Sequence, residues 1–340
     1  MMEVDGMRAL YALLAVLGLA ILGWLGASQP WLLGVILPAL AFVVFLTGFV
    51  YRVVLWGRAP VPFRITSVAG QQASLPWIPR SPLDSPKNGW EAALRVALDV
   101  LLFRSLFRNT RVRRGKGRMP IYSSERFLWA AALAFHWSLL VVLVRHLRFV
   151  VEAPPALLAT VEQWDGFFQL TTPTLFVTDG LILGALLFLL GRRLVERPLR
   201  YLSLPADYFP LFLLLGVAGS GVYMRYYGKT DLLAVKEFVL GLVTLQPRVP
   251  AGIDGVFFLH LFLVSSLLAY FPFSKLMHMG GIFLSPTRNL ANDNRRRRHV
   301  NPWNPQVEVH TYEQWEEEFK DKLVAAGYQI EGGVSHGQNT

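Results

Sequence analysis

The sequence predicts an all-α membrane protein with six transmembrane helices, and two features of the chain support this fold class. First, 53% of its 340 residues are hydrophobic, and they gather in runs of roughly 20, enough helix to cross about 30 Å of hydrocarbon. Second, basic residues crowd some connections between the runs and are missing from others, which is typical of multi-pass membrane proteins. The predicted spans are residues 8–27, 31–55, 127–149, 173–191, 209–227 and 254–276.

The first two spans form an N-terminal unit, residues 1–56. The opening span follows the polar stretch MMEVDGMR, and the small residues GAS at 26–28 resemble a signal-peptidase site. Its apolar core is long for a signal peptide, so we expect a retained helix.

Charge between the spans predicts the orientation in the membrane. Residues 57–126 carry thirteen Lys or Arg against four Asp or Glu. Short loops rich in Lys and Arg stay on the cytoplasmic side, so this loop is expected inside. The loop at 192–208 is also basic, whereas residues 151–168 contain three acids and no Lys or Arg. Both chain ends are therefore expected in the cytoplasm.

The charge distribution and the lack of cysteine exclude several classes of function. The net charge of +10 comes from these loops and from RRRR at 295–298. Positive-inside topology, with some attraction to anionic lipid, accounts for it better than nucleic-acid binding. A chain without cysteine cannot ligate an ordinary iron–sulfur cluster, attach haem covalently or use a thiol nucleophile. Soluble-enzyme motifs such as a Walker A loop or HExxH are also missing from the sequence.

Four histidines lie in two of the predicted spans. His136 and His146 are in the third span, and His260 and His278 open and close the sixth. The two spans are separated by three crossings and run antiparallel, so His136 is level with His278 toward the cytoplasm and His146 with His260 toward the outside. Along straight helices, His260 and His278 would be about 27 Å apart and His136 and His146 about 15 Å. Tilted helices or tilted ligand planes are needed to reconcile these separations.

Two imidazoles from facing helices, at each of two depths, are what two stacked b-type haems require. Neutral imidazole nitrogen binds iron well, and two imidazoles fill both axial positions of a haem held without a covalent bond. The sequence therefore predicts an antiparallel dihaem-binding helix pair. His136 and His278 would bind the inner haem iron, and His146 and His260 the outer one. The alternatives are a proton relay, as in a histidine-dependent transporter, and histidines satisfied within the core.

Three charged residues lie close to the predicted outer haem. Arg145 and Arg148 flank His146, where a guanidinium could pair with haem propionates or with a quinone head group. Snorkelling to the interface is the alternative for both arginines. Asp179, in the outer half of the fourth span, could accept a proton during quinone chemistry, or cap or pair locally.

Two stretches outside the spans are amphipathic. TDLLAVKEFVLGLVTL at 230–245 is expected to lie flat at the outer interface or to dock a partner. In the tail, residues 286–340, Thr311 and Gln314 form a capping box ahead of an apolar stripe at helical spacing. A short helix of this kind cannot bury its own stripe, which predicts docking to a cytoplasmic partner or a partly disordered tail.

The histidine spacing carries a resemblance to a known family. Histidines ten apart in one helix and eighteen apart in a later antiparallel one, with FHW at 135–137 and PFSKLMH at 272–278, resemble the dihaem gamma subunit of respiratory nitrate reductase. The resemblance covers residues 127–285. It implies a four-helix dihaem cytochrome b domain over these residues, with the four histidines as axial ligands.

Stretches that extend beyond that domain resemble a narrower family. They are similar to the M subunits (DsrM) of the DsrMKJOP membrane complexes of sulfur metabolism, and together they cover nearly the whole chain. The stretches are RITSVAGQQASLPWI, LLFRSLFRNT, LSLPADYFPLFLLLG, YFPFSKLMHMGGIFLSPTRN and HVNPWNPQVEVHTYEQWEEEF.

The second resemblance implies a function in sulfur metabolism at the prokaryotic inner membrane. M subunits hold two haem b groups and exchange electrons with menaquinone near the outer haem. They pass electrons to or from a cytoplasmic iron–sulfur K subunit that resembles heterodisulfide reductase, in sulfite reduction or sulfur oxidation. The J, O and P subunits would be a multihaem cytochrome c, a ferredoxin-like protein and a second membrane subunit. We therefore expect an electron-transfer subunit of a quinone-linked oxidoreductase, with the gamma subunit of a nitrate or heterodisulfide reductase as the nearest alternative.

Overall fold

The computed structural model describes residues 2–59, 81–114, 120–153, 155–167, 174–228, 230–285, 289–291 and 309–330, and these residues are predominantly helical. The long helices are α1 (Met2–Leu25), α2 (Leu37–Arg58), α5 (Arg126–His146), α7 (Val177–Val195), α9 (Pro205–Tyr223) and α11 (Gly255–Tyr270). The shorter helices are α3 (Gly89–Leu101), α4 (Arg104–Phe107), α6 (Ala156–Asp165), α8 (Arg197–Leu202), α10 (Leu232–Val243), α12 (His278–Leu284) and α13 (Tyr312–Ala325). The strands are β1 (Thr110–Arg114) and β2 (Pro120–Ser124). Short 3₁₀ or π turns are η1 (Gly26–Ser28), η2 (Leu32–Ile36), η4 (Leu147–Phe149), η5 (Met224–Gly228), η6 (Phe271–Phe273) and η7 (Lys275–Met277).

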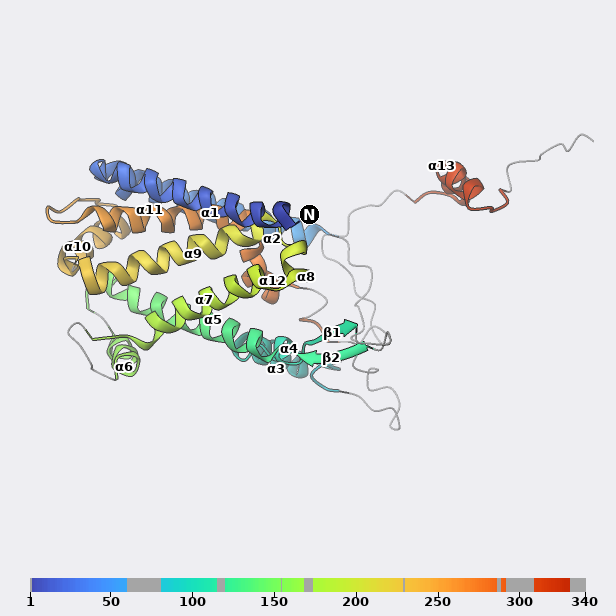
Figure 1. Cartoon of the computed structure of the whole chain (residues 1–340), viewed down its shortest axis with the longest axis horizontal. Helices are drawn as coiled ribbons and strands as arrows, with labels where there is room; N and C mark the ends of the chain where they lie inside the picture. Colours follow the sequence, from blue (N-terminus) through green and yellow to red (C-terminus); the bar gives the residue numbers. More distant parts are fainter. Residues whose placement is uncertain are drawn as a thin grey trace, which may run out of the picture.

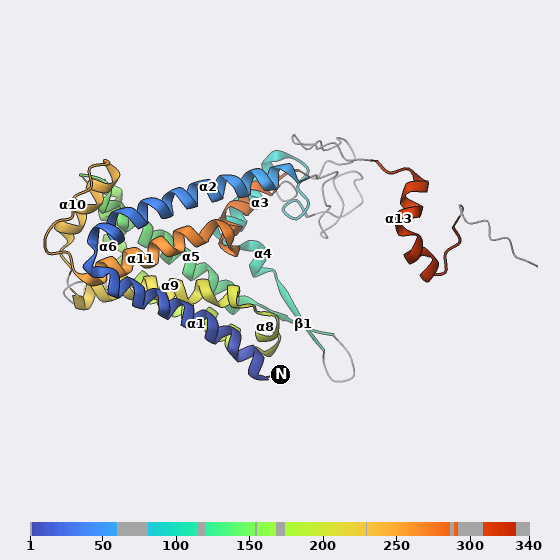
Figure 2. The same ribbon diagram turned by 90° about the horizontal axis from the view of Figure 1, so that it is seen from above.

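The long helices run roughly along one direction of the molecule (Figures 1 and 2). Within the described ranges, five helical segments are long and apolar enough to cross a membrane: Gly6–Ser28, Leu32–Arg58, Arg126–Phe149, Pro205–Gly228 and Gly255–Phe273. They match five of the six predicted spans. The remaining prediction, the fourth span at residues 173–191, falls on α7, whose 19 residues include Asp179, Arg192 and Arg193 and so carry more charge. Residue 173 itself lies outside the described residues.

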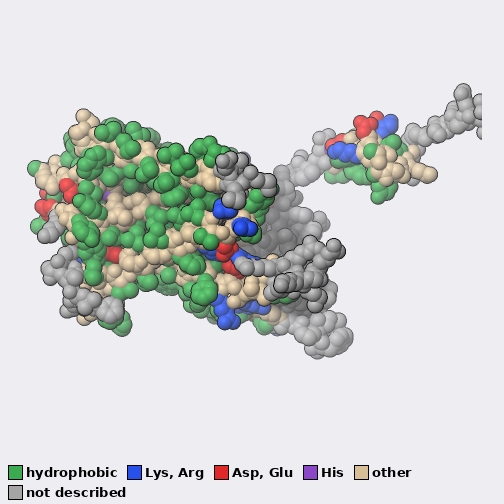
Figure 3. Space-filling view, viewed as in Figure 1, with side chains coloured by type: hydrophobic (Ala, Val, Ile, Leu, Met, Phe, Trp, Pro, Cys, Tyr) green, Lys and Arg blue, Asp and Glu red, His purple; other side chains and the backbone are tan. Residues whose placement is uncertain are grey.

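The two N-terminal helices belong to the same bundle as the later ones. α1 packs along α9 and α11, α2 packs along α11, and α7 lies between α5 and α9. Apolar side chains on the outward faces of α1 and α2 are exposed, for example Leu14 and Phe42. Hydrophobic side chains cover most of the body in Figure 3, and charged side chains gather mainly toward its ends. This distribution suits a bundle whose sides face lipid.

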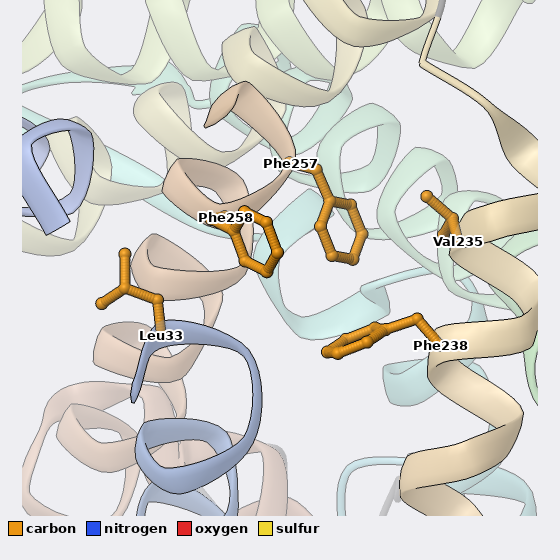
Figure 4. Close-up of a cluster of buried hydrophobic side chains, with 5 residues drawn as sticks. All are labelled: Leu33, Val235, Phe238, Phe257 and Phe258. Atoms are coloured by element: carbon orange, nitrogen blue, oxygen red, sulfur yellow. The ribbon is translucent and has the colours of Figure 1, made fainter. Parts of the chain in front are cut away.

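A cluster of apolar side chains ties α10 to one end of the bundle (Figure 4). Phe238 and Val235 belong to α10. They pack with Phe257 and Phe258 of α11 and with Leu33 of η2. The rings of Phe238 and Phe257 meet edge to face, with centroids 5.6 Å apart. The amphipathic stretch predicted in this connection is therefore a helix whose apolar face packs on the bundle.

The sixth predicted span is not one straight helix. α11 ends at Tyr270, the chain makes the two short turns η6 and η7, and α12 begins at His278. Pro272 in η6 has no backbone NH to donate, and Ser274 is extended between the turns, with φ −119° and ψ 176°. The straight-helix separation of about 27 Å between His260 and His278 therefore does not hold.

Residues 81–114 and 120–124, predicted as part of a cytoplasmic loop, contain regular elements. α3 and α4 are followed by a hairpin in which β1 and β2 pair antiparallel. Trp129 and Trp137 of α5 hold the end of α3, because their ring NH groups donate to the carbonyl oxygens of Leu102 (2.8 Å) and Leu101 (3.0 Å). The structure therefore attaches much of the predicted loop directly to α5.

A closed ring of four charges fastens the hairpin to the bundle. Arg111 of β1 pairs with Glu125 (2.5 Å), which precedes α5, and with Glu196, which follows α7. Arg192 of α7 pairs with the same two carboxylates at 3.0 and 3.3 Å. Each charge thus has two partners of opposite sign, which offsets the cost of removing these groups from water.

Asp84 holds the segment before α3 against α4. Its carboxylate accepts hydrogen bonds from Arg104 (2.8 Å), Arg108 and Ser81 (2.8 Å). The bond from Arg104 above all holds the pKa of Asp84 well below its usual range. Because the pKa of Asp84 is lower in the folded than in the unfolded protein, its ionised carboxylate stabilises the fold. This contribution is complete above the unfolded-state pKa of about 3.9, and it is lost as the pH falls through the folded-state pKa.

The helix predicted in the tail is present as α13, which Figure 1 draws apart from the bundle. Thr311 Oγ1 accepts from the Gln314 backbone NH at 3.3 Å, and Gln314 Oε1 accepts from the Thr311 backbone NH at 2.9 Å. These two bonds confirm the predicted capping box. Two stretches quoted from the sequence, RITSVAGQQASLPWI at 64–78 and RRRR at 295–298, lie outside the described residues.

Gly34 of η2 marks the tightest approach in the cluster of Figure 4. A Cβ there would lie 2.9 Å from Phe238 Cζ and 3.0 Å from Phe258 Cε1. We expect Gly34→Ala to lower the free energy of unfolding by about 1–3 kcal/mol, because two rigid rings must move to admit the methyl group. In the control Gly18→Ala, the Cβ meets no atom within 4 Å. That change should leave stability unchanged or raise it by about 0.5 kcal/mol. Thermal unfolding in detergent compares the variants, and equal effects would contradict this packing.

Candidate functional site

The four histidines singled out in the sequence lie on α5, α11 and α12. His136 is in the middle of α5 and His146 is its last residue. His260 lies in the first half of α11, and His278 is the first residue of α12. α5 starts at the end of the molecule that holds the hairpin, whereas α11 starts at the end that holds α10 (Figure 1). The antiparallel course puts His136 and His278 toward the hairpin end, and the other two toward α10.

The rings of His136 and His278 lie next to each other. Their centroids are 5.9 Å apart, and the ring planes are inclined by 80°. Two imidazoles on one iron have centroids about 6 Å apart, because each metal–nitrogen bond is about 2 Å and each ring adds about 1 Å. The separation therefore suits an iron atom between the two rings. At the other level, His146 is near enough to His260 to act on it electrostatically.

Three of the four histidines hydrogen-bond through Nδ1 to a backbone carbonyl of the preceding turn. The pairs are His136 with Ala132 (2.8 Å), His146 with Val142 (2.7 Å) and His278 with Lys275 (2.8 Å). A carbonyl oxygen only accepts, so Nδ1 carries the proton in each neutral ring. The lone pair then lies on Nε2, which leaves that atom available to bind iron.

His260 is held differently, by a side chain of another helix. Its Nδ1 lies 2.9 Å from the hydroxyl oxygen of Ser220 in α9. Gly221, the next residue of α9, permits this approach, since a Cβ there would lie 3.4 Å from Cε1 of His260. The sequence did not single out Ser220, because a serine in an apolar helix usually bonds only its own backbone.

This set of donors fits a haem better than a bare metal ion. In the part of the chain that the structure describes, no three His, Cys, Asp or Glu side chains gather where they could hold an ion by themselves. A haem brings four nitrogen ligands of its own and needs two from the protein, one on each face. His136 and His278, with free Nε2 atoms on adjacent rings, supply that number.

Phe103, between α3 and α4, lies against the His136 ring. The two ring centroids are 4.9 Å apart at an angle of 79°. The φ of Phe103 is 50°, a left-handed conformation that costs a bulky residue about 1–3 kcal/mol. Phe135 contacts the same imidazole from its own helix, with centroids 4.9 Å apart. Two aromatic rings therefore keep water from one side of His136. No local sequence pattern predicted the contact between Phe103 and this histidine.

Arg145 lies at the centre of a buried polar network at the C-terminal end of α5. Its guanidinium is 2.7 Å from Asp179 Oδ1 and 3.4 Å from Asp165 Oδ2. It also stacks on Phe176, 3.9 Å from the ring centroid. The Arg145 side chain is 10% exposed and that of Asp165 only 3%, so little water screens the pair. One cation thus joins α5 to α6 and α7.

Two residues of η5, the turn after α9, complete this network. The Tyr226 hydroxyl donates to Asp179 Oδ2 at 2.9 Å and accepts from the Phe176 backbone NH at 3.0 Å. Arg225 stacks on Phe176 at 3.8 Å and donates to the Thr174 carbonyl at 3.0 Å. Asp179 is therefore held by a cation from α5 and by a hydroxyl from the end of α9.

Arg148 has a separate partner, Glu162 of α6, at 2.8 Å. The structure thus brings Arg145 and Asp179 together and pairs Arg148 apart from them. All three charges are near enough to His146 to act on it electrostatically. Each has a partner within the chain, so a haem propionate or a quinone would have to join or displace these pairs. Their roles toward haem and quinone stay predictions.

An apolar helical bundle with paired, Nε2-free histidines is consistent with a membrane cytochrome b. The chain belongs to the nitrate reductase gamma subunit family, whose model matches residues 93–294. That range holds all four histidines of the candidate site, and the match confirms the broader of the two resemblances drawn from the sequence.

Two archaeal relatives are similar over most of their length. Both are described as the Hdr-like menaquinol oxidoreductase cytochrome b-like subunit. The protein of Archaeoglobus fulgidus is 44% identical over 279 residues, and that of Archaeoglobus profundus is 43% identical over 280 residues. Each alignment covers 80% of this chain and 83% of the relative.

The network around Arg145 predicts a large, specific effect on stability. We expect Arg145→Met to lower the free energy of unfolding by about 3 kcal/mol, because Asp165 and Asp179 lose their shared cation. Adding Asp179→Asn should restore part of that loss by removing one uncompensated charge. Arg148→Met is the control and should cost about 1 kcal/mol or less, since its pair is more exposed. Thermal unfolding of the single and double variants gives the coupling energy, and additive effects would contradict the network.

Proposed function

We propose that the protein is a six-helix dihaem cytochrome b, the membrane subunit of a complex that moves electrons between menaquinone and a cytoplasmic iron–sulfur partner in sulfur metabolism. In this proposal α7 is the fourth of the six spans, added to the five helical segments described above. It packs between α5 and α9, which are both long and apolar enough to cross a membrane. Its charges do not oppose the assignment, because Asp179 pairs with Arg145 near one end and Arg192 with Glu125 at the other.

The arrangement of the histidines is the observation that carries the proposal. The ring centroids of His136 and His278 lie 5.9 Å apart, and their Nδ1 atoms are bonded to carbonyl oxygens. The lone pair of each ring is then on Nε2, for which the described part of the chain offers no hydrogen-bond partner. His146 and His260 form a second level, with Nδ1 atoms that are also bonded within the chain. We therefore assign the first pair to an inner haem b and the second pair to an outer one.

Haem with two histidine ligands supplies one-electron transfer and has no open position for oxygen or substrate. The chain's own residues hold and shield the two groups. Helices α5 and α11 with α12 present the ligands, and Phe103 and Phe135 exclude water beside His136. This arrangement suits a conductor of electrons better than a site of bond chemistry.

Menaquinone is the proposed exchange partner at the outer end, near His146. The names of both relatives, menaquinol oxidoreductase subunits, support this choice. Arg145 and Arg148 are the proposed contacts for a haem propionate or the quinone head group. Asp179 is the proposed proton acceptor, and Tyr226, which donates to it at 2.9 Å, would link it to the quinone.

The hairpin end is the proposed cytoplasmic face, and it contains α3, α4 and the ring of four charges. The segment from α3 to α4 lies beside the inner histidine pair through Phe103, so electrons would leave there. The partner would be the iron–sulfur K subunit, as "Hdr-like" in the relatives' names supports. The chain would then be the M subunit of a DsrMKJOP complex with J, O and P subunits, in the prokaryotic inner membrane, with both termini in the cytoplasm.

Two alternatives lead to different partners or chemistry. A gamma subunit of a nitrate or heterodisulfide reductase would share the haem site and differ in its cytoplasmic partner, which co-purification identifies. A transporter that relays protons through the histidines is less well supported. The Nδ1 protons of His136, His146 and His278 are bonded to backbone carbonyls, which cannot pass them on.

Single histidine substitutions test the two haem sites. We expect the purified wild type to show b-type absorption bands and two haems per chain. His136→Ala and His278→Ala should each remove the same haem, and His146→Ala and His260→Ala the other, because each iron loses one axial ligand. His310→Ala, in the exposed part of the tail, is the control and should retain both haems. Redox difference spectra with haem quantification give the result.

Two outcomes would contradict this assignment. A wild-type protein without b-type bands would remove the cytochrome function. Loss of different haems within a pair would show that the pairing is wrong while leaving the cytochrome function in place.

Reduction by a menaquinol analogue tests the position of the quinone site. In His136→Ala and His278→Ala, the remaining outer haem should be reduced as fast as in the wild type, since it lies next to the quinone. In His146→Ala and His260→Ala, reduction of the inner haem should slow by at least about tenfold, because that haem receives electrons through the outer one. Stopped-flow absorption follows both reactions. Undiminished reduction of the inner haem would put the quinone elsewhere.

A further inference from the structure

The Nδ1 atom of His260 is hydrogen-bonded to a kind of partner that the other three histidines do not use. Their Nδ1 atoms bond to backbone carbonyls of their own helical turn, which no side-chain substitution can remove. The Nδ1 of His260 bonds to a side chain of a different helix, Ser220 of α9, at 2.9 Å. The Val217 carbonyl oxygen of α9 also lies within hydrogen-bonding reach of this ring, and the Ser220 hydroxyl is the partner that a side-chain substitution can remove.

The direction of this hydrogen bond follows from the surroundings of the hydroxyl. Ser220 Oγ lies 2.8 Å from the Gly216 carbonyl oxygen and 3.0 Å from that of Val217. A serine hydroxyl has one proton, and these acceptors of its own helix take it. With the hydroxyl proton on a carbonyl of its own helix, the hydroxyl oxygen accepts from His260 Nδ1, and the Val217 carbonyl near the ring favours the same tautomer. The lone pair of His260 consequently lies on Nε2.

The local backbone of α9 supports the same contact. Gly221 lets the imidazole approach, because a Cβ at that position would come within 3.4 Å of Cε1 and 3.9 Å of Nδ1 of His260. The backbone carbonyl of Gly216, one helical turn before Ser220, lies 2.8 Å from the Ser220 hydroxyl oxygen. α9 and α11 pack along each other, so the serine is held in place by the bundle and not by a mobile loop.

We propose that Ser220 is a positioning residue for the outer haem: it holds His260 in the tautomer that presents Nε2 to iron, and it adjusts the reduction potential of that haem through the hydrogen bond to Nδ1. This inference rests on the proposed dihaem function. A hydrogen bond from Nδ1–H makes an imidazole ligand more basic, and a more basic ligand favours the oxidised iron. Loss of the acceptor therefore raises the midpoint potential of the outer haem.

The test compares two variants of the same shape, Ser220→Thr and Ser220→Val, in the full-length protein purified in detergent. Threonine keeps the hydroxyl and valine replaces it with a methyl group, so any effect of the extra bulk is common to both. In Ser220→Val, we expect the midpoint potential of the outer haem to shift positively relative to Ser220→Thr. The outer haem should also pass to apomyoglobin about 10- to 100-fold faster. The potential of the inner haem should be the same in both variants.

Ser266→Ala is the matched control. Its hydroxyl bonds to the carbonyl four residues earlier, Phe262, at 2.8 Å, the same local bond that Ser220 makes. Because that serine holds no histidine, both haems should titrate as in the wild type. The haem lost in His260→Ala identifies which potential belongs to the outer site.

The outcomes separate this inference from the proposed function. A wild type without haem would overturn the dihaem function itself. A wild type with two haems, in which Ser220→Thr and Ser220→Val give equal potentials and equal haem release, would overturn the role of Ser220 alone. A shift of both haems, or an equal shift in Ser266→Ala, would also overturn it, because a general change of the bundle would then be the cause.

Discussion

The exclusion of water from the bundle is the constraint on which the rest of the structure depends. A polar group within hydrocarbon must find its partner inside the chain, because none is available outside. Arg145 meets much of this demand with an Nη2–Asp179 hydrogen bond at 2.7 Å, whereas its Nε lies 3.4 Å from Asp165 and makes no hydrogen bond among the described residues. The imidazoles meet it through Nδ1, each bonded to a carbonyl or a hydroxyl. The ring nitrogen left over is Nε2, the atom that would bind an iron. The hydrogen bonds that satisfy Nδ1 therefore also orient each histidine as a ligand.

The break after α11 shows how the bundle shapes the site at a distance. Pro272 ends the helix, and α2 packs directly on the break: Phe45 lies 5.6 Å from Phe271, and a Cβ at Gly48 would lie 2.8 Å from Pro272. A continuous helix would carry His278 past the level of its partner. The broken one places it beside the His136 ring. The N-terminal helices, which contribute no histidine, therefore help to position one.

The sequence predicted what depends on composition and spacing, and it missed what depends on contacts between distant segments. Long apolar runs predicted five spans that the structure supports. The remaining span, α7, contains three charged residues, which explains why it is less apolar than the other five. The four histidines stood out because ionisable groups in apolar runs are rare. Phe103 and Ser220 did not, since a phenylalanine in a loop and a serine in a helix are common. The effect of Pro272 was visible in principle, because a proline near the end of a run predicts a helix end.

The two ends of the bundle are held by charges in different ways, and α5 is fixed by both. At the hairpin end, Glu125 just before α5 belongs to the ring with Arg111 and Arg192. At the other end, Arg145 ties the last turn of α5 to α6 and α7. The helix that carries His136 and His146 is thus anchored at each terminus to α7, and the spacing of its two imidazoles is set by an unbroken helix. The partner histidines sit on a broken helix that packing must position. In the proposed dihaem function, electron transfer would depend on the separation between the two haems, and the unbroken helix α5 is the part of the site that can define this separation.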